Sequence, residues 1–313
     1  MRLATAVLEE FLKSHRVVRV LERGGVTVVG LATSTGTAPD YLTFDEALDR
    51  ALVDVEEVSA GGSVPECRVR NRSASRLLLV EGEEIRGAKQ NRILNTSAFL
   101  EKESETVIPV SCVEKGRWRY ESATFAKGSR APSSLLYAMK SSVTRSLRSE
   151  ASYRSDQWAV WNETADCLSA AGTSSPTDSL SDAYDKRRKE LDDFVGRIGS
   201  LEGSTGVAVL VGDRVVACEL FDRPATFSRL QERILTGVAF DVLFRNRDLP
   251  AGEVDLREAS RRTESWLERL SGLAPSSHPS VGLGENLRLE EADLVGSALV
   301  VGDSVLHFGA QGR

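Results

Sequence analysis

Hydrophobic and polar residues follow two different periods along this chain. From Val53 to Tyr120, short apolar or alternating runs are separated by turn residues, which is typical of a mainly antiparallel sheet. Leu77 to Val80 are apolar at consecutive positions, so we expect both faces of that strand to be covered. The runs that predict strands are 53–58, 67–69, 77–80, 93–100 and 107–113.

Helical periodicity replaces this pattern after Ala131. Apolar residues at 136, 139, 143 and 147, and then at 158, 161, 165 and 168, predict two helices, each with a buried stripe. A third helix is expected from Leu180 to Leu201. Nearer the N-terminus, residues 3–12 predict a short amphipathic helix and residues 26–29 predict a strand. Thr43 and Glu46 have the spacing of a capping box, which marks a helix start.

The C-terminal third contains an internal repeat. Residues 206–216 resemble residues 296–306, and both segments place Gly-Asp between two β-branched runs. Glycine adopts positive φ at little steric cost, so each segment predicts a tight hairpin. Two helices are expected between the hairpins, and the two hairpins are expected to share one sheet. The sequence thus predicts an α+β fold of mainly antiparallel sheets, sandwich-like or barrel-like, with several helices inserted between and after the strands.

Charge and cysteine usage exclude several classes of protein. The 313 residues include 40 basic and 46 acidic ones, a net charge of -6, which argues against binding of duplex nucleic acid. We expect no signal peptide and no membrane span. Four scattered cysteines indicate the reducing cytoplasm, and three distant histidines argue against a metal centre. No cofactor is expected, and the oligomeric state stays open.

The densest polar run extends from Glu81 to Arg92 between two predicted strands. Three carboxylates are followed by cations and carboxamides, which can offer guanidinium forks and amide groups to a phosphate or carboxylate. The alternative is a solvated connection whose charges keep a hairpin soluble. The candidate ligand-binding residues of this run are Arg86, Lys89, Gln90, Asn91 and Arg92.

A second cluster follows from Pro109 to Trp118. Arg117 and Trp118 could stack a planar ligand, although a tryptophan that closes the core is the structural alternative. Cys112 shares a strand face with an apolar residue, which favours packing over nucleophilic chemistry. His307 is a further candidate, because it occupies the place of Ala217 in the repeat. Acid–base catalysis by Glu83 or Glu114 would require spatial proximity that sequence does not report.

These blocks together resemble the ARPP-1 domain family, named for its association with ADP-ribosylglycohydrolase and rhodanese-phosphatase proteins. The resemblance rests on residues 81–92, 108–118, 155–161, 206–211 and 305–307. It implies a single domain over residues 26–313, preceded by an N-terminal helix and strand extension over 1–25. By context it implies a link to NAD or ADP-ribose metabolism, and it transfers no catalytic residues. Independently of the resemblance, the Ser-, Gly- and Pro-containing stretch 169–181 indicates a flexible connection or a surface loop between helices.

Three functions are compatible with these residues. The leading hypothesis is a binding or sensing module for a phosphate-bearing, nucleotide-like metabolite. The second is a nucleotide-directed hydrolase with a glutamate as general base. The third is a protein-interaction or scaffold module in which the motif residues form a buried polar network. Whether the chain is an enzyme is left open by the sequence.

Overall fold

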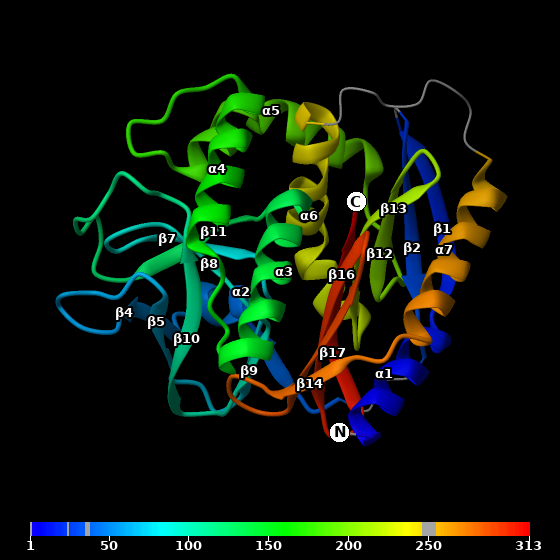
Figure 1. The fold of residues 1–313 in the computed structure, drawn as a ribbon, viewed down its shortest axis with the longest axis horizontal. Coiled ribbons are helices and arrows are strands. Elements are labelled where there is room, and N and C mark those ends of the chain that lie inside the picture. Colours follow the sequence, from blue (N-terminus) through cyan, green and yellow to red (C-terminus); the bar gives the residue numbers. More distant parts are fainter. Residues whose placement is uncertain (1, 24, 35–37, 246–254) are drawn as a thin grey trace. The chain divides into compact units, whose positions relative to one another are not determined.

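Seven helices and seventeen strands make up the part of the chain that the structure, a computed structural model, describes, namely residues 2–23, 25–34, 38–245 and 255–313. The predicted α+β class is confirmed, and the sheets are mostly antiparallel (Figure 1). The helices are α1 (Arg2–Ser14), α2 (Phe44–Asp49), α3 (Ser133–Glu150), α4 (Gln157–Ala171), α5 (Leu180–Ile198), α6 (Pro224–Phe240) and α7 (Leu256–Ser271), and a π-helical turn, Asp241–Arg245, follows α6.

The strands include two that hydrophobic patterning does not predict, β7 and β11. Most positions of β7 are charged and most positions of β11 are polar or glycine, which masks the period of two. The strands are β1 (Arg16–Arg23), β2 (Val26–Ala32), β3 (Tyr41–Thr43), β4 (Val53–Glu57), β5 (Glu66–Asn71), β6 (Arg76–Leu79), β7 (Glu83–Gly87), β8 (Arg92–Leu94), β9 (Ala98–Leu100), β10 (Ser104–Cys112), β11 (Phe125–Arg130), β12 (Gly206–Val211), β13 (Arg214–Phe221), β14 (Ser276–Pro279), β15 (Glu285–Glu291), β16 (Leu294–Val301) and β17 (Ser304–Gly312).

The chain divides into two compact units. Unit 1 contains residues 1–38, 189–279 and 285–313, and unit 2 contains residues 39–188 and 280–284. The boundary at residues 188 and 189 falls within α5. Strand β1, which belongs to the predicted N-terminal extension, pairs with β2 inside unit 1. The single-domain organisation of 26–313 stays a prediction.

Unit 2 contains two sheets, the helices α2, α3 and α4, and the first part of α5. The six-stranded sheet has the order β11-β7-β8-β10-β5-β4, and the smaller one has the order β3-β6-β9 with β3 and β6 parallel. Strand β6 is central in the smaller sheet, and its leucines are buried on both faces as predicted. The predicted capping box is confirmed, because Thr43 Oγ1 accepts from Glu46 N–H while Glu46 Oε2 accepts from Thr43 N–H at 3.0 Å.

Residues 280–284 return to unit 2 from far along the chain. Leu283 N–H donates to the carbonyl of Phe99 at 2.8 Å, and Gly282 forms a parallel bridge with the same residue of β9. Gly282 has φ +88°, and a Cβ there would lie 2.4 Å from the Phe99 carbonyl oxygen. Only glycine therefore lets the backbone approach β9 this closely.

Unit 1 contains one eight-stranded sheet, of order β1-β2-β12-β13-β17-β16-β15-β14. The two predicted hairpins are confirmed as β12-β13 and β16-β17, and both lie in this sheet. Their turns place Gly212 at φ +61° and Gly302 at φ +58°. Each hairpin has a register shift at the same step, between 209 and 210 and between 299 and 300. The local resemblance of sequence thus corresponds to a repeat of backbone structure.

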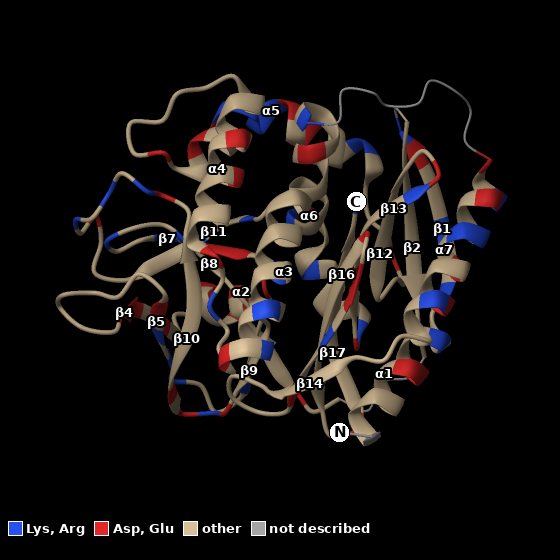
Figure 2. Cartoon of the chain, in the orientation of Figure 1, with Lys and Arg blue, Asp and Glu red and all other residues tan. Residues whose placement is uncertain are grey.

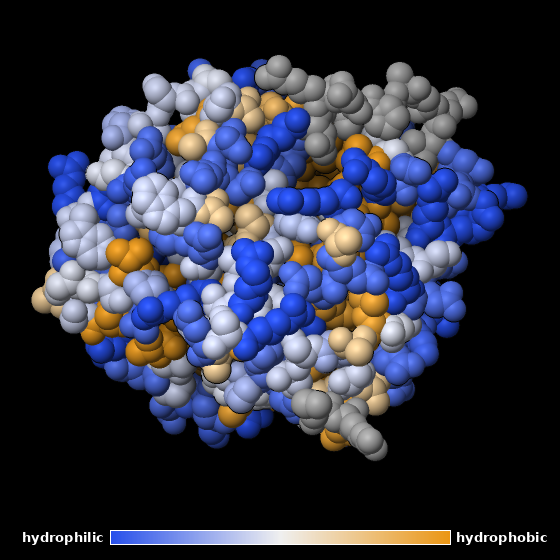
Figure 3. All heavy atoms as spheres, in the orientation of Figure 1, coloured by the Kyte–Doolittle hydropathy of each residue, from blue (hydrophilic) through white to orange (hydrophobic). Residues whose placement is uncertain are grey.

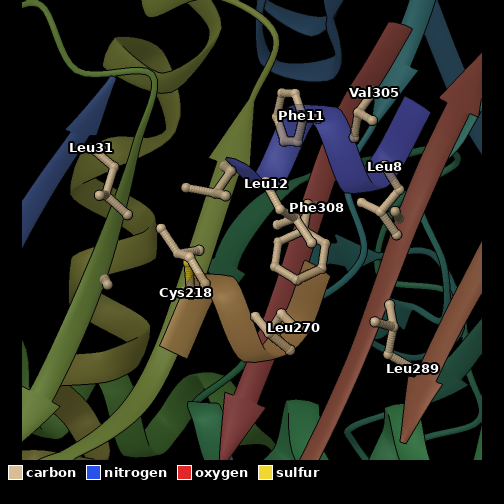
Figure 4. Packing of buried hydrophobic residues seen from close by; sticks show 14 of the residues in the cluster. Leu8, Phe11, Leu12, Leu31, Cys218, Leu270, Leu289, Val305 and Phe308 are labelled. Carbon is tan, nitrogen blue, oxygen red and sulfur yellow. The ribbon is translucent and has the colours of Figure 1, made fainter. Parts of the chain in front are cut away.

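The repeat extends to helices α1 and α7 and to all eight strands of this sheet. Glu219 of β13 pairs with Gly309 of β17, and these two residues occupy equivalent positions in the two repeated segments. The pairing of β13 with β17 is therefore symmetric about them. Helix α1 precedes β1 and β2, as α7 precedes β14 and β15, and each helix packs on strands of the other half. Figure 4 shows Leu12 of α1 and Leu270 of α7 meeting over Phe308. One helix followed by four strands is therefore present twice in unit 1, and residues 39–188 enter the chain between β2 and β12 of the first copy. Helix α6 and the end of α5 have no counterpart in the second copy among the described residues.

The surface is largely polar on the face drawn in Figure 3, where apolar residues form small separate patches. Helix α7 carries both signs of charge along its length (Figure 2), and its Arg262 and Arg269 pair with Glu258 and Asp293 at 2.8 and 2.9 Å. None of the described helices combines the length and the apolar composition that are needed to cross a membrane.

Candidate functional site

The polar run from Glu81 to Arg92 is folded into unit 2 and is mostly buried. It turns into β7, leaves through a second turn at residues 88–91 and continues into β8. Glu81, Glu84 and Arg92 have no exposed surface, and Gln90 and Asn91 are about as well buried. Only Arg86 and Lys89 reach solvent in part. The alternative of a solvated connection is therefore wrong, because such a loop would leave these charges in water.

A short turn brings the polar run 81–92 into contact with the cluster at residues 109–118. Gly87 has φ +114° and Ala88 has φ +40°, which reverses the chain between β7 and β8. Asn91 Oδ1 accepts from Gly87 N–H at 2.9 Å and closes the turn. Asn91 N–H donates to Glu114 Oε2 at 3.0 Å. The two sequence blocks thus share a direct hydrogen bond.

Glu114 and Arg117 form a bidentate ion pair beneath the surface. Arg117 Nε donates to Glu114 Oε1 at 2.8 Å and Nη2 donates to Oε2 at 2.6 Å, with both residues only 5% exposed. The same guanidinium donates to the carbonyls of Ala88 and Gly87 at 2.7 and 3.2 Å. Burial alone would raise the pKa of the Glu114 carboxyl, but hydrogen bonds from Arg117, Asn91 N–H and Thr177 lower it below its usual value.

The network continues into residues 175–181. Asn91 Nδ2 donates to Ser179 Oγ and Ser181 Oγ at 3.2 and 3.3 Å, and Ser181 Oγ donates to Glu84 Oε1 at 2.6 Å. Thr177 Oγ1 donates to Glu114 Oε1 at 2.8 Å. These residues belong to the stretch in which a flexible connection is predicted. Here they link the start of α5 to β7 and to the end of β10.

A second buried pair joins Arg92 to Glu57. Arg92 Nη2 lies 3.1 and 3.2 Å from the two Glu57 oxygens, and Nη1 donates to the carbonyls of Ser63 and Val64 at 2.6 Å. Glu57 was not a candidate in the sequence, although the alternation of β4 places it on the buried face with Val53 and Val55. The Arg92 guanidinium is therefore engaged by the protein itself.

The loop between β10 and β11 carries aromatic residues on its outside. Within it, residues 114–121 form a segment that we call the aromatic loop. Trp118 and Tyr120 are 46% and 51% exposed, whereas Arg117, which precedes Trp118 in the sequence, is buried. Lys89 Nζ lies 5.2 Å from the Trp118 ring centroid and 5.0 Å from that of Tyr120, and it donates to the Gly61 carbonyl at 2.8 Å. The prediction that Trp118 closes the core is wrong, since the Glu114–Arg117 pair holds the loop instead.

The family model described as the ARG and Rhodanese-Phosphatase-superfamily-associated Protein domain, ARPP-1, matches residues 14–310. This chain belongs to the ARPP-1 family. The match spans nearly all of the 313 residues, which confirms the resemblance seen in the sequence. No curated protein and no solved structure matches the chain. The family name records an association with other proteins and specifies no reaction.

The two candidate catalytic carboxylates of this ARPP-1 chain both accept hydrogen bonds from other groups of unit 2. Glu83 is buried and its Oε2 accepts from Val80 N–H at 2.8 Å. Glu114 is ionised in its pair with Arg117, and a low carboxyl pKa disfavours proton abstraction near neutral pH. Glu81 is likewise buried against Lys140 Nζ at 2.6 Å. These arrangements suit anchoring better than general-base catalysis.

The remaining candidates lie apart from this cluster. Arg86 projects from β7 and its guanidinium lies 3.5 Å from the Asp185 carboxylate, with its side chain 38% exposed. His307 belongs to unit 1, where its Nε2 lies 2.7 Å from Glu219 Oε2 and its ring lies 4.9 Å from that of Phe221. Gln311 Nε2 donates to the other Glu219 oxygen at 3.1 Å. Unit 2 thus brings together Glu114, Lys89, Gln90, Asn91, Arg92, Arg117 and Trp118.

The four cysteines of the ARPP-1 chain are buried. Burial raises the pKa of the Cys67 thiol to about 12 and raises that of Cys112 as well. We therefore expect 5,5′-dithiobis(2-nitrobenzoate) at pH 8 to react with few thiols in the folded protein and with all four after denaturation. Rapid reaction of Cys112 in the folded protein, located by mass spectrometry, would contradict this assignment.

Proposed function

We propose that this ARPP-1 protein binds a phosphate-bearing, nucleotide-like ligand at its aromatic loop. The observation that carries the proposal is that Trp118 and Tyr120, both about half exposed, each have a ring centroid within 5.2 Å of the Lys89 ammonium group. An aromatic face can stack a planar ring, and an adjacent cation favours a phosphate. Exposed rings of this size have no role in the core of unit 2, so a binding role accounts for their position.

The buried network supports the proposal by fixing the loop before a ligand arrives. A loop that is already ordered loses less conformational entropy on binding, which leaves more of the contact energy as affinity. Glu114, Arg117, Asn91 and Arg92 are scaffold residues in this interpretation, because the protein already uses their polar groups. Of the two cations that lie over the Trp118 ring, Lys89 and Arg92, Lys89 also lies over Tyr120 and reaches solvent in part, whereas Arg92 is fully buried.

Two buried polar atoms at the end of the polar run give further support. Gln90 Oε1 and Arg92 Nε have no hydrogen-bond partner among the described residues. Buried polar groups are usually satisfied by protein, water or ligand, so such atoms are typical of a place where another molecule completes the network. The Arg92 guanidinium carbon lies 5.7 Å from the Trp118 ring centroid, which places it next to the proposed stacking position.

Calorimetric titration with AMP, ADP, ADP-ribose and NAD tests the proposal. We expect at least one of them to bind the wild-type protein, and Trp118→Ala to weaken that binding about 10-fold or more, since stacking contributes roughly 1–3 kcal/mol per base. Trp118→Phe should retain most of the affinity because it keeps a ring.

Val107→Ala serves as the matched control. Val107 is an exposed apolar residue of unit 2 on β10, 47% exposed and outside the aromatic loop, so its loss should leave binding unchanged. The proposal fails if folded wild-type protein gives no heat with any of the four compounds. It also fails if Trp118→Ala binds them as tightly as the wild type.

A further inference from the structure

A second pair of aromatic rings with its own lysine lies beside the base of the aromatic loop. Trp158 is 66% exposed, and its ring meets that of Trp161 edge to face with centroids 5.5 Å apart. Lys115 Nζ lies 5.2 Å from the Trp158 centroid and 5.3 Å from that of Trp161. The helical period predicts Trp158 in a buried stripe of α4, and that prediction is wrong. An exposed tryptophan capped by a cation repeats the chemistry of Trp118, Tyr120 and Lys89.

The two ring pairs are attached to one rigid base. Gln157, at the start of α4, forms two hydrogen bonds with the backbone of Cys112, from Cys112 N–H at 2.9 Å and to the Cys112 carbonyl at 2.8 Å. Asp156 caps the same helix end by accepting from Trp158 N–H at 3.0 Å. Cys112 ends β10, and Lys115 and Trp118 follow it within the loop held by the Glu114–Arg117 pair. Both ring pairs are therefore held in place without a ligand.

We propose that Trp158, Trp161 and Lys115 form a second subsite, so that the ligand is a dinucleotide, two nucleosides joined by a diphosphate. This proposal rests on the proposed function, since the first nucleoside stacks at Trp118. The second nucleoside stacks at Trp158, and Lys89 and Lys115 supply positive charge for the diphosphate. The chain's net charge of -6 disfavours a long polyanion, which favours this small ligand over a nucleic-acid strand.

Titration with AMP and with diadenosine diphosphate separates the two subsites. We expect the wild type to bind the dinucleotide about 10-fold or more tightly than AMP, because two stacking sites act on one molecule. Trp158→Ala should reduce the dinucleotide affinity to that of AMP and leave the AMP affinity unchanged within about twofold. Trp118→Ala should weaken both ligands.

The outcomes distinguish this inference from the function on which it rests. Unchanged dinucleotide affinity in folded Trp158→Ala overturns the second subsite, while AMP binding that depends on Trp118 would still stand. Tighter binding of a single-stranded oligoadenylate than of the dinucleotide overturns it in favour of a strand. If the folded wild type binds neither AMP nor the dinucleotide, this inference fails, and the proposed function fails with it only if ADP, ADP-ribose and NAD also give no heat.

Discussion

Replacing Arg117 with alanine is expected to lower the free energy of unfolding of unit 2 by about 3–5 kcal/mol, the usual cost of leaving one buried charge without its partner. The substitution would leave the Glu114 carboxylate, which is 5% exposed, without its charged partner. It would also remove hydrogen-bond donors from the Gly87 and Ala88 carbonyls. Because Arg117 anchors the aromatic loop, ligand affinity should fall with stability. Urea denaturation followed by circular dichroism measures the first effect, and hydrogen exchange of residues 113–124 measures the loop directly.

Arg119 provides a matched control two residues away. It is an exposed arginine of the same loop, so Arg119→Ala should change stability by no more than about 0.5 kcal/mol. The double variant Glu114→Ala/Arg117→Ala should cost less than the sum of the two single variants, because no charge is left unpaired. Equal stability of Arg117→Ala and Arg119→Ala would show that the pair does not anchor the loop.

Acidification between pH 6.5 and pH 4 is expected to destabilise unit 1 through His15. The pKa of this histidine is lowered from 6.5 to about 4, mainly by burial; the hydrogen bond to the Phe11 carbonyl opposes this shift and the nearby Arg16 adds to it. Its Nδ1 lies 2.8 Å from that carbonyl and its Nε2 lies 3.2 Å from Thr205 Oγ1, which suits the neutral ring. Lys13, Arg16, Glu264 and Glu268 line the cavity beside it.

The sign follows from the two protonation states. Above pH 6.5 the ring is neutral in both folded and unfolded chains, so His15 adds no pH dependence. As the pH falls from 6.5 to about 4, only the unfolded chain takes up the proton, and the free energy of unfolding decreases by about 3 kcal/mol in all. Below about pH 4 both states are protonated and this contribution stays constant.

His15→Leu tests the assignment with a residue that the repeat itself supplies. Ala4 and Leu12 of α1 have the spacing of Ala259 and Leu267 of α7, which aligns His15 with the buried Leu270. The variant should therefore fold, and its stability should depend less on pH between 6.5 and 4 than that of the wild type. Parallel pH curves for the two proteins, measured by urea denaturation, would show that another group titrates.

Local sequence signals were sufficient where neighbouring residues decide the structure. The capping box at Thr43 needs only the hydroxyl and carboxylate three residues apart, and the hairpins at Gly212 and Gly302 need only the positive φ that glycine permits. The consecutive leucines of β6 predict a strand covered on both faces because side chains alternate across a sheet. These signals together establish the α+β class.

The candidate site depended on contacts between distant residues. Glu57 meets Arg92 across 35 positions, and Asn91 meets Ser181 across 90. A period of two places Glu57 on a buried face, but nothing in the local sequence names the guanidinium that would neutralise it. For that reason, the sequence was compatible both with a solvent-exposed polar run and with a buried one.

The sequence by itself determined the helices and strands that have a clear hydrophobic period, which two segments repeat, and that residues 81–92 and 109–118 carry the unusual polar chemistry. Only the tertiary structure decided that the polar run is a buried scaffold and that Trp118 and Trp158 are left in solvent. The physical reason is that burial of a charge depends on whether a partner from another part of the chain pays its desolvation cost. Here Glu114, Thr177 and Glu57 do so, and the aromatic rings that the core does not need face outward.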